Sequence, residues 1–213
     1  MTSGVREILF RFFAAAAALM LTLRPVSAEP SIWQLCANQN HAYTFDQQIG
    51  GCTSVIETHH ENQMNLSVAY ENRGIAYLNK KDYENALSDL SEAIRLNPNS
   101  AKALNERCWT SGLVSHDLAG ALADCNEALR LLPNNPNFLN SRGLVQLKLG
   151  TFDRAIADYG SAVAQNPKDA GSLYGRGVAK LKSGNTADGN ADITAAKAIR
   201  PDIAEVYSGY GVK

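Results

Sequence analysis

Four prolines recur at a nearly constant spacing, and this feature limits the possible folds more than any other. The intervals between Pro98, Pro133, Pro167 and Pro201 are 35, 34 and 34 residues. Columns of arginine, aspartate and alanine repeat with the same interval. A period near 34 residues predicts an array of helix–turn–helix units, in which each unit buries its apolar face against its neighbours. The chain is therefore expected to be an all-α solenoid.

One period shows how a unit is built. Between Ala69 and Pro98, apolar and small residues recur at helical spacing, and the polar segment 79–82 separates two such runs. Gly74 and Ala86 are small at positions where two helix backbones must approach closely. Pro98 cannot continue a helix and therefore ends the second one.

These residues resemble the tetratricopeptide repeat. In the first clear unit the matching positions are Tyr70, Gly74, Tyr77, Ala86, Leu90, Ala93 and Pro98. The resemblance implies a right-handed α-solenoid in which the first helix of each unit lines a concave groove. The expected parts are a degenerate leading unit, four clear units and a solvating end helix, at residues 29–66, 67–100, 101–135, 136–169, 170–203 and 204–213. Within the leading unit, residues 31–39 are expected to be the first helix and residues 61–66 a long connector.

Residues 1–28 have the pattern of a secretory signal peptide. Arg6 and Arg11 supply positive charge, residues 12–23 are an apolar run, and residues 26–28 are a small-residue cleavage site. The apolar run has 12 residues, whereas a membrane span needs about 20. The pattern predicts cleavage before Glu29, no stable membrane insertion afterwards, and a periplasmic or secreted protein. The alternative is a retained signal anchor.

Four cysteines in an exported protein suggest two disulfides. Cys36 precedes Cys52 by 16 residues, which is also the separation of the glycine and the leucine that meet in the next unit. Cys108 and Cys125 occupy the same two columns with one inserted residue between them. The repeat therefore predicts the bonds Cys36–Cys52 and Cys108–Cys125. The alternative is four buried free thiols that act as small apolar side chains.

Arginine and aspartate columns lie 16 or 17 residues apart in four units. The pairs are Arg73 and Asp89, Arg107 and Asp124, Arg142 and Asp158, and Arg176 and Asp192. Pairing within a unit leaves no charge alone, whereas pairing each aspartate with the next arginine would strand Arg73 and Asp192. The sequence therefore predicts four structural ion pairs inside the units. The alternative is that the arginines hold anionic groups of a ligand.

Two columns on the first helices are expected to line the groove. One is apolar and the other is mainly polar: Ile75, Trp109, Leu144 and Val178, then Glu71, Asn105, Asn140 and Tyr174. Such a surface could hold an extended or helical peptide, with Trp109 as the main anchor. The alternative is that the apolar column packs against neighbouring helices. Some members of the family hold a C-terminal carboxylate with lysine and asparagine, but here Asn72 is followed by Glu106, Ser141 and Gly175 in its column.

Other functions are disfavoured by composition. The chain has 20 basic and 21 acidic residues and no basic run, which argues against nucleic acid as a partner. The four histidines do not form a metal-ligand pattern, so no metal or other cofactor is expected. No acid or base recurs beside a nucleophile, so an enzyme is not expected either. The predicted function is an exported scaffold that binds a protein or peptide, and the alternative is a structural or self-associating envelope component.

Overall fold

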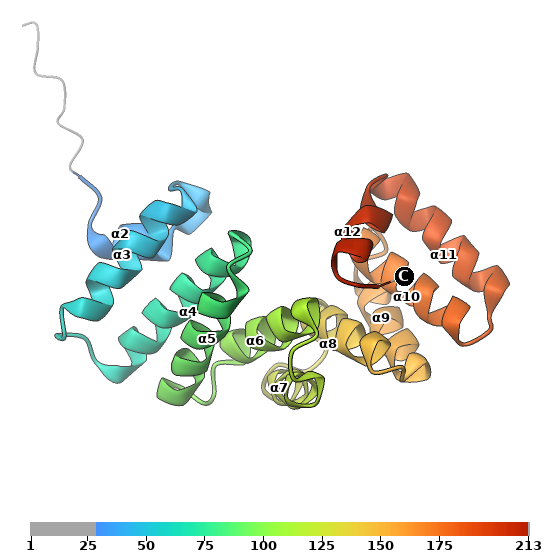
Figure 1. Ribbon diagram of the computed structural model, residues 1–213, viewed down its shortest axis with the longest axis horizontal. Coiled ribbons are helices and arrows are strands. Elements are labelled where there is room, and N and C mark those ends of the chain that lie inside the picture. The colour runs from blue at the N-terminus through green and yellow to red at the C-terminus, as the bar shows by residue number, and fades with distance from the viewer. Residues whose placement is uncertain (1–28, 213) are drawn as a thin grey trace, which may run out of the picture. The chain divides into compact units, whose positions relative to one another are not determined.

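The computed structural model describes residues 29–212, which contain eleven α-helices, one 3-10 helix and no strand (Figure 1). The described residues from Ser31 onward form one compact unit. The expected signal segment at residues 1–28 lies outside the described residues. The helix labels begin at α2.

The helices pack in consecutive pairs, one pair for each unit, followed by a single short helix. The bounds are α2 Ile32–Ala37 and α3 Phe45–Glu57, with the 3-10 helix Gln39–His41 between them; α4 Gln63–Asn79 and α5 Tyr83–Leu96; α6 Ala101–Val114 and α7 Leu118–Leu131; α8 Pro136–Lys148 and α9 Phe152–Gln165; α10 Ala170–Lys182 and α11 Thr186–Ile199; and α12 Ile203–Gly209. First helices also pack on the first helices of neighbouring units, α6 on α8 and α8 on α10. The all-α solenoid that the sequence predicts is confirmed.

The recurring prolines end the second helices. In each of four units the last helical residue stands two positions before the proline, and the residue between them has left the helical region. These intervening residues have φ between −129° and −136° and ψ between 83° and 98°: Asn97, Leu132, Asn166 and Arg200. A proline ring clashes with the preceding residue in the helical conformation and moves it to extended backbone. The period of the prolines is therefore the period of the helix pairs.

A small residue faces a large one where the two helices of a unit meet. Tyr159 on α9 is fully buried, and a Cβ built on Gly143 of α8 would stand 2.9 Å from its ring carbon Cζ. A Cβ built on Gly175 of α10 would stand 2.3 Å from the same atom. Tyr159 therefore occupies space that two glycines leave open.

Disulfides replace this contact in two units. Cys36 is bonded to Cys52 and Cys108 to Cys125, with Cα–Cα separations of 4.4 and 5.5 Å. All four cysteines are fully buried, and no free cysteine occurs in the described part of the chain. The sulfurs therefore pair as the repeat columns predict.

The leading unit differs from its expected limits. Helix α2 ends at Ala37, not at residue 39, because Asn38 takes a left-handed conformation with φ of 41°. Its side chain holds this turn by bonding the backbone of Tyr43 and the amide of Gln48. Helix α4 already begins at Gln63, so most of the expected connector at residues 61–66 is helical. The asparagine at position 62 caps α4 by accepting from a backbone N–H in its first turn.

Candidate functional site

The arginine and aspartate columns form a ladder of ion pairs inside the units. Each arginine donates from Nε and Nη2 to both oxygens of its aspartate, and the Nε–Oδ2 distance is 2.7 Å in every pair. The pairs are Arg73–Asp89, Arg107–Asp124, Arg142–Asp158 and Arg176–Asp192. The bidentate geometry matches the planar guanidinium to the carboxylate. Each pair is largely removed from solvent.

Three of these arginines also connect their unit to the preceding one. The remaining nitrogen Nη1 donates to a polar side chain of the previous second helix: Arg73 to Thr53 at 3.0 Å, Arg107 to Ser91 at 3.2 Å and Arg142 to Asn126 at 3.0 Å. Gly160 occupies the corresponding position before Arg176 and has no side chain to accept. The guanidinium groups are therefore used in holding the solenoid together. These acceptors were not predicted from the sequence, because threonine, serine and asparagine are different residue types and do not repeat as one conserved-looking residue.

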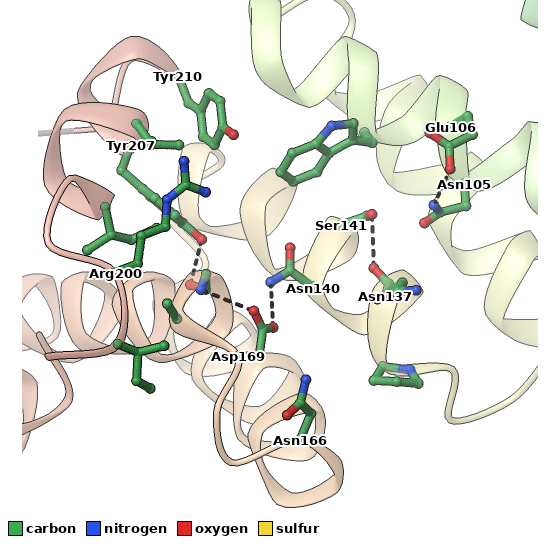
Figure 2. A pocket seen from close by; sticks show the side chains of 17 residues that line it. Asn105, Glu106, Asn137, Asn140, Ser141, Asn166, Asp169, Arg200, Tyr207 and Tyr210 are labelled. Carbon is green, nitrogen blue, oxygen red and sulfur yellow. Dashed lines mark hydrogen bonds between the residues drawn. The ribbon is translucent and has the colours of Figure 1, made fainter. Parts of the chain in front are cut away.

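A cavity with a volume of about 710 Å³ lies where α6, α8 and α10 face α12 (Figure 2). Helix α6 contributes Asn105 and Trp109, and helix α8 contributes Asn140. Asp169 comes from the start of α10, and Tyr210 follows α12. Three of the eight residues predicted to line the groove, Asn105, Trp109 and Asn140, therefore lie in this cavity. We call it the inner pocket.

The expectation that the whole apolar column faces the groove is wrong for two of its members. Leu144 has no exposed surface and Val178 is only 7% exposed. Both belong to the main hydrophobic cluster, with Tyr159 and Leu173. Neither side chain lines the inner pocket, so these positions stabilise the fold. Ile75, on α4, does not line the inner pocket.

Two members of the polar column are also used within the fold. Glu71 accepts from the Ser100 hydroxyl at 2.7 Å and forms an ion pair with Lys102 at 2.9 Å. It therefore joins α4 to the start of α6. Tyr174 packs on Tyr207, with ring centroids 4.8 Å apart. The spacing of the repeat placed these residues on first helices but did not show which neighbours they meet.

The end helix α12 forms one wall of the inner pocket. Ile203 and Tyr207 are both buried, and the Tyr207 hydroxyl donates to the Gly171 carbonyl at 2.7 Å. Tyr210 meets Trp109 edge to face, with centroids 5.6 Å apart and ring planes at 82°. Figure 2 shows both tyrosines opposite Asn105. The expected solvating end helix therefore has a buried face as well, and sequence spacing gave no signal of its contact with α6.

Most polar groups of the inner pocket already have partners. Asp169 caps α10 by accepting from the backbone of Gly171 at 3.1 Å and of Ser172 at 3.3 Å. Asn140 donates to the Ser172 hydroxyl at 2.7 Å. Arg200 forms an ion pair with Asp202 at 3.0 Å. These groups shape the pocket, and each of them already has a partner within the fold.

The α6 side of the pocket is different. Asn105 is 4% exposed, and its Oδ1 has no hydrogen-bond partner among the described residues. Its Nδ2 donates to Glu106 Oε1 at the long distance of 3.4 Å (Figure 2). Burial raises the pKa of the Glu106 carboxyl, although the nearby Lys102 and Asn105 act in the opposite direction. Lys102 itself is bonded to Glu71. Glu106 was not predicted as a site residue. It occupies the repeat column of Asn72, and this change from asparagine to an acid was the signal in the sequence.

Metal binding finds no support in the described part of the chain. No three side chains of histidine, cysteine, aspartate or glutamate converge there in a way that could hold a metal ion. His41, His59, His60 and His116 are all exposed. In the same residues, no helix combines the length and apolarity that a membrane crossing requires.

Comparison with known proteins identifies the repeats. Two models of the tetratricopeptide repeat match the chain, one at residues 67–100 and the other at residues 140–204. Both segments are tetratricopeptide repeats. The first match has the limits predicted for the first clear unit, and the second spans α9, α10 and α11 with most of α8 and the start of α12. The intervening residues 101–139 contain α6 and α7, whose interhelical contact is the Cys108–Cys125 disulfide.

Related proteins agree with this fold. Protein unc-45 homolog B from Danio rerio is 40% identical over 65 residues, which are 30% of this chain and 7% of that protein. This chain therefore matches less than a tenth of that relative's length. Among solved structures, YrrB, described as a TPR protein with an unusual peptide-binding site, has a TM-score of 0.62 and 19% identity, and the match covers 82% of this chain and 87% of YrrB. A MamA structure has a TM-score of 0.64 and 17% identity, over 82% of this chain and 92% of MamA.

Proposed function

We propose that this tetratricopeptide-repeat chain is a scaffold that binds a protein or peptide in the inner pocket. The observation that carries the proposal is the α6 wall, where Trp109 and Asn105 line one cavity and the buried Oδ1 of Asn105 has no hydrogen-bond partner among the described residues. A buried acceptor without a partner costs about 1–3 kcal/mol, and a ligand donor would recover that cost. Aromatic side chains at the edge of such a cavity are frequent anchors for partners.

Affinity capture with matched variants tests this function. The wild-type protein and Trp109→Ala are immobilised and exposed to the protein fraction in which the chain is found, and captured proteins are identified by mass spectrometry. Trp109→Ala is expected to weaken capture by about 2 kcal/mol or more. Met64→Ala is the control, because Met64 is 55% exposed on α4 and lies outside the pocket. Equal capture by all three proteins would contradict the proposal.

Folding must be separated from binding, because Trp109 also packs against the main hydrophobic cluster. The melting temperature of each variant is therefore measured in parallel. Asn137→Ala is a second test, since this exposed asparagine lines the pocket without belonging to the core. It is expected to reduce capture without changing the melting temperature. If the only captured protein were a second copy of this chain, the alternative of a self-associating component would be favoured.

We also propose that the protein acts outside the cytoplasm. Two buried disulfides support this location, because such bonds persist in oxidising compartments. The signal-like sequence of residues 1–28 points the same way. Intact-mass measurement of the native protein is expected to give a chain that starts at Glu29 with four oxidised cysteines. A full-length chain with free thiols in the cytoplasm would overturn this part of the proposal.

A further inference from the structure

We propose that the partner presents a basic side chain, lysine or arginine, to the Asn105–Glu106 end of the inner pocket. This inference rests on the proposed function, because it specifies the chemistry of the segment that the pocket would bind. It makes Asn105 and Glu106 the residues that determine specificity, whereas Trp109 supplies apolar contact.

The first argument is the kind of group that lacks a partner. Asn105 Oδ1 can only accept a hydrogen bond, and an ionised Glu106 carboxylate is also only an acceptor. The amide N–H₂ of Asn105 is already directed at Glu106. The site therefore needs a ligand that donates hydrogen bonds. A neutral donor would satisfy Asn105, but a cationic donor would also pair with the partly buried carboxylate of Glu106.

The second argument is the contrast with the other carboxylates nearby. Asp169 accepts two backbone N–H groups, and Glu71 is paired with Lys102. Among the described residues, no lysine or arginine side chain lies within ion-pair distance of Glu106. Lys102, whose charge lowers the pKa of Glu106, is already bonded to Glu71. Removing a carboxylate partly from water without a cation is costly, and an incoming cation would offset that cost. Glu106 is therefore the acid that the fold leaves available.

The third argument is the neighbourhood of this acceptor pair. Trp109 stands one helical turn after Asn105 on α6, so both side chains lie on the same face of the helix. Lysine and arginine have an apolar stem and a charged end. An aromatic surface beside a pair of acceptors suits both parts of such a side chain. The Arg200 guanidinium, the positive group of the lining, is paired with Asp202 and would not repel the ligand strongly.

A random dodecapeptide phage-display library is the probe that tests this inference. The library is selected in parallel on the wild-type protein, on Glu106→Gln, on Glu127→Gln and on Trp109→Ala. Glu127→Gln is the matched control, because it removes the same charge from a partly exposed residue of α7 outside the pocket, in the same helix pair as Glu106. The frequency of lysine and arginine at each position is compared with that of the unselected library.

The expected result is a shared basic position in peptides selected on the wild-type protein and on Glu127→Gln. This position should lose its enrichment on Glu106→Gln. A selected peptide is then synthesised with its basic residue and with norleucine in the same place. The basic form should bind the wild-type protein about tenfold more tightly or better, which corresponds to about 1.4 kcal/mol, and this preference should weaken in high salt and be absent in Glu106→Gln.

The outcomes separate this inference from the proposed function. Peptides without a shared basic position, selected on the wild-type protein but not on Trp109→Ala, would overturn the inference and leave the binding function standing. A basic preference that persists in Glu106→Gln would also overturn it. If the wild-type protein selects no peptide above the Trp109→Ala background, the proposed peptide-binding function fails, and this inference fails with it.

Discussion

The arginine ladder and the inner pocket use similar side chains in opposite ways. In the ladder, Arg142 and Asp158 satisfy each other through two hydrogen bonds, and Asn126 of the preceding unit accepts a third. In the pocket, Asn105 has a buried oxygen without a partner, and Glu106 has no ion pair among the described residues. The ladder is a closed network, whereas the pocket wall is an incomplete one.

This difference separates stability from binding. A fully satisfied polar network fixes neighbouring elements and leaves nothing for a ligand to recover. An incomplete network costs stability in the free protein, and that cost is a reason to expect a ligand at the site. The repeating arginines and aspartates of the ladder therefore say less about function than the residues of the pocket wall do. The informative pair, Asn105 and Glu106, occurs in one unit.

Helix α6 belongs to both regions. It carries Arg107 of the ladder and three residues of the pocket wall, and Cys108 bonds it to α7. The helix with the incomplete polar network is thus covalently held to its partner helix. The other disulfide, Cys36–Cys52, holds α2 to α3, which do not line the inner pocket.

Removing either disulfide should lower the stability of the fold, and this is the largest effect expected. Only removal of Cys108–Cys125 should also weaken peptide capture. Closing a loop of this length stabilises the fold by about 3 kcal/mol. The double change Cys108→Ala with Cys125→Ala should cost about that amount in urea unfolding and should also weaken peptide capture. The double change Cys36→Ala with Cys52→Ala is the control. It should cost similar stability but leave capture nearly unchanged, and equal loss of capture in both would show that α6 does not govern the pocket.

Breaking the ladder is the next test. Asp158→Ala leaves the Arg142 guanidinium without its bidentate partner, and a cost of about 2–3 kcal/mol is expected because the pair is largely removed from solvent. The control Glu127→Ala breaks an exposed pair with Arg130 and should cost less than about 0.5 kcal/mol. Urea unfolding measures both.

A replacement of both charged partners sharpens this test. Arg142→Met combined with Asp158→Leu should regain most of the lost stability, because no unpaired charge is left behind. A cost for Asp158→Ala no greater than that for Glu127→Ala would mean that the ladder is not structural.

The sequence predicted the repeating parts of the fold because each signal occurs several times. The prolines define where second helices end, and the columns define which side chains meet inside a unit. The disulfide pairs and the ladder follow from those columns. Gly143 and Tyr159 show the same principle, since a missing side chain on one helix makes room for a large one on the other.

The inner pocket could not be predicted in the same way, because it depends on contacts that do not repeat. Tyr210, which follows α12 near the end of the chain, contacts Trp109 of α6, and no column of the repeat predicts that contact. Leu144 and Val178 share a column with Trp109 but are enclosed by the main hydrophobic cluster. The period of the repeat predicted which helix carries each residue and at which position. Whether a side chain is exposed depends on how neighbouring units and α12 pack against it.

The smallest expected effect is a gain of stability when the charge of Glu106 is removed from the pocket wall. Burial is the main influence on the Glu106 carboxyl and raises its pKa, with Glu71 acting in the same direction and Lys102 and Asn105 against it. The folded state therefore binds the proton more tightly than the unfolded state does. Stability therefore falls as the pH rises from the ordinary glutamate range through the raised pKa, and the full cost is present once the carboxyl is ionised. Glu106→Gln should remove this cost and gain about 0.5 kcal/mol or more at neutral pH.

In the ladder, the pH dependence of stability is expected to have the opposite sign to that of Glu106. Burial alone would raise the pKa of Asp192, but hydrogen bonds from Arg176 and Lys180 outweigh it and the pKa is lowered. Its stabilisation is therefore present above the ordinary aspartate range and is lost as the pH falls through the lowered value. Asp192→Asn should destabilise the protein at neutral pH, and its melting temperature should approach that of the wild type in acid. Glu106→Gln should also converge with the wild type in acid, but from above. If Glu106→Gln melted below the wild type at neutral pH, Glu106 would be a stabilising residue like those of the ladder, and the contrast between the two regions would fail.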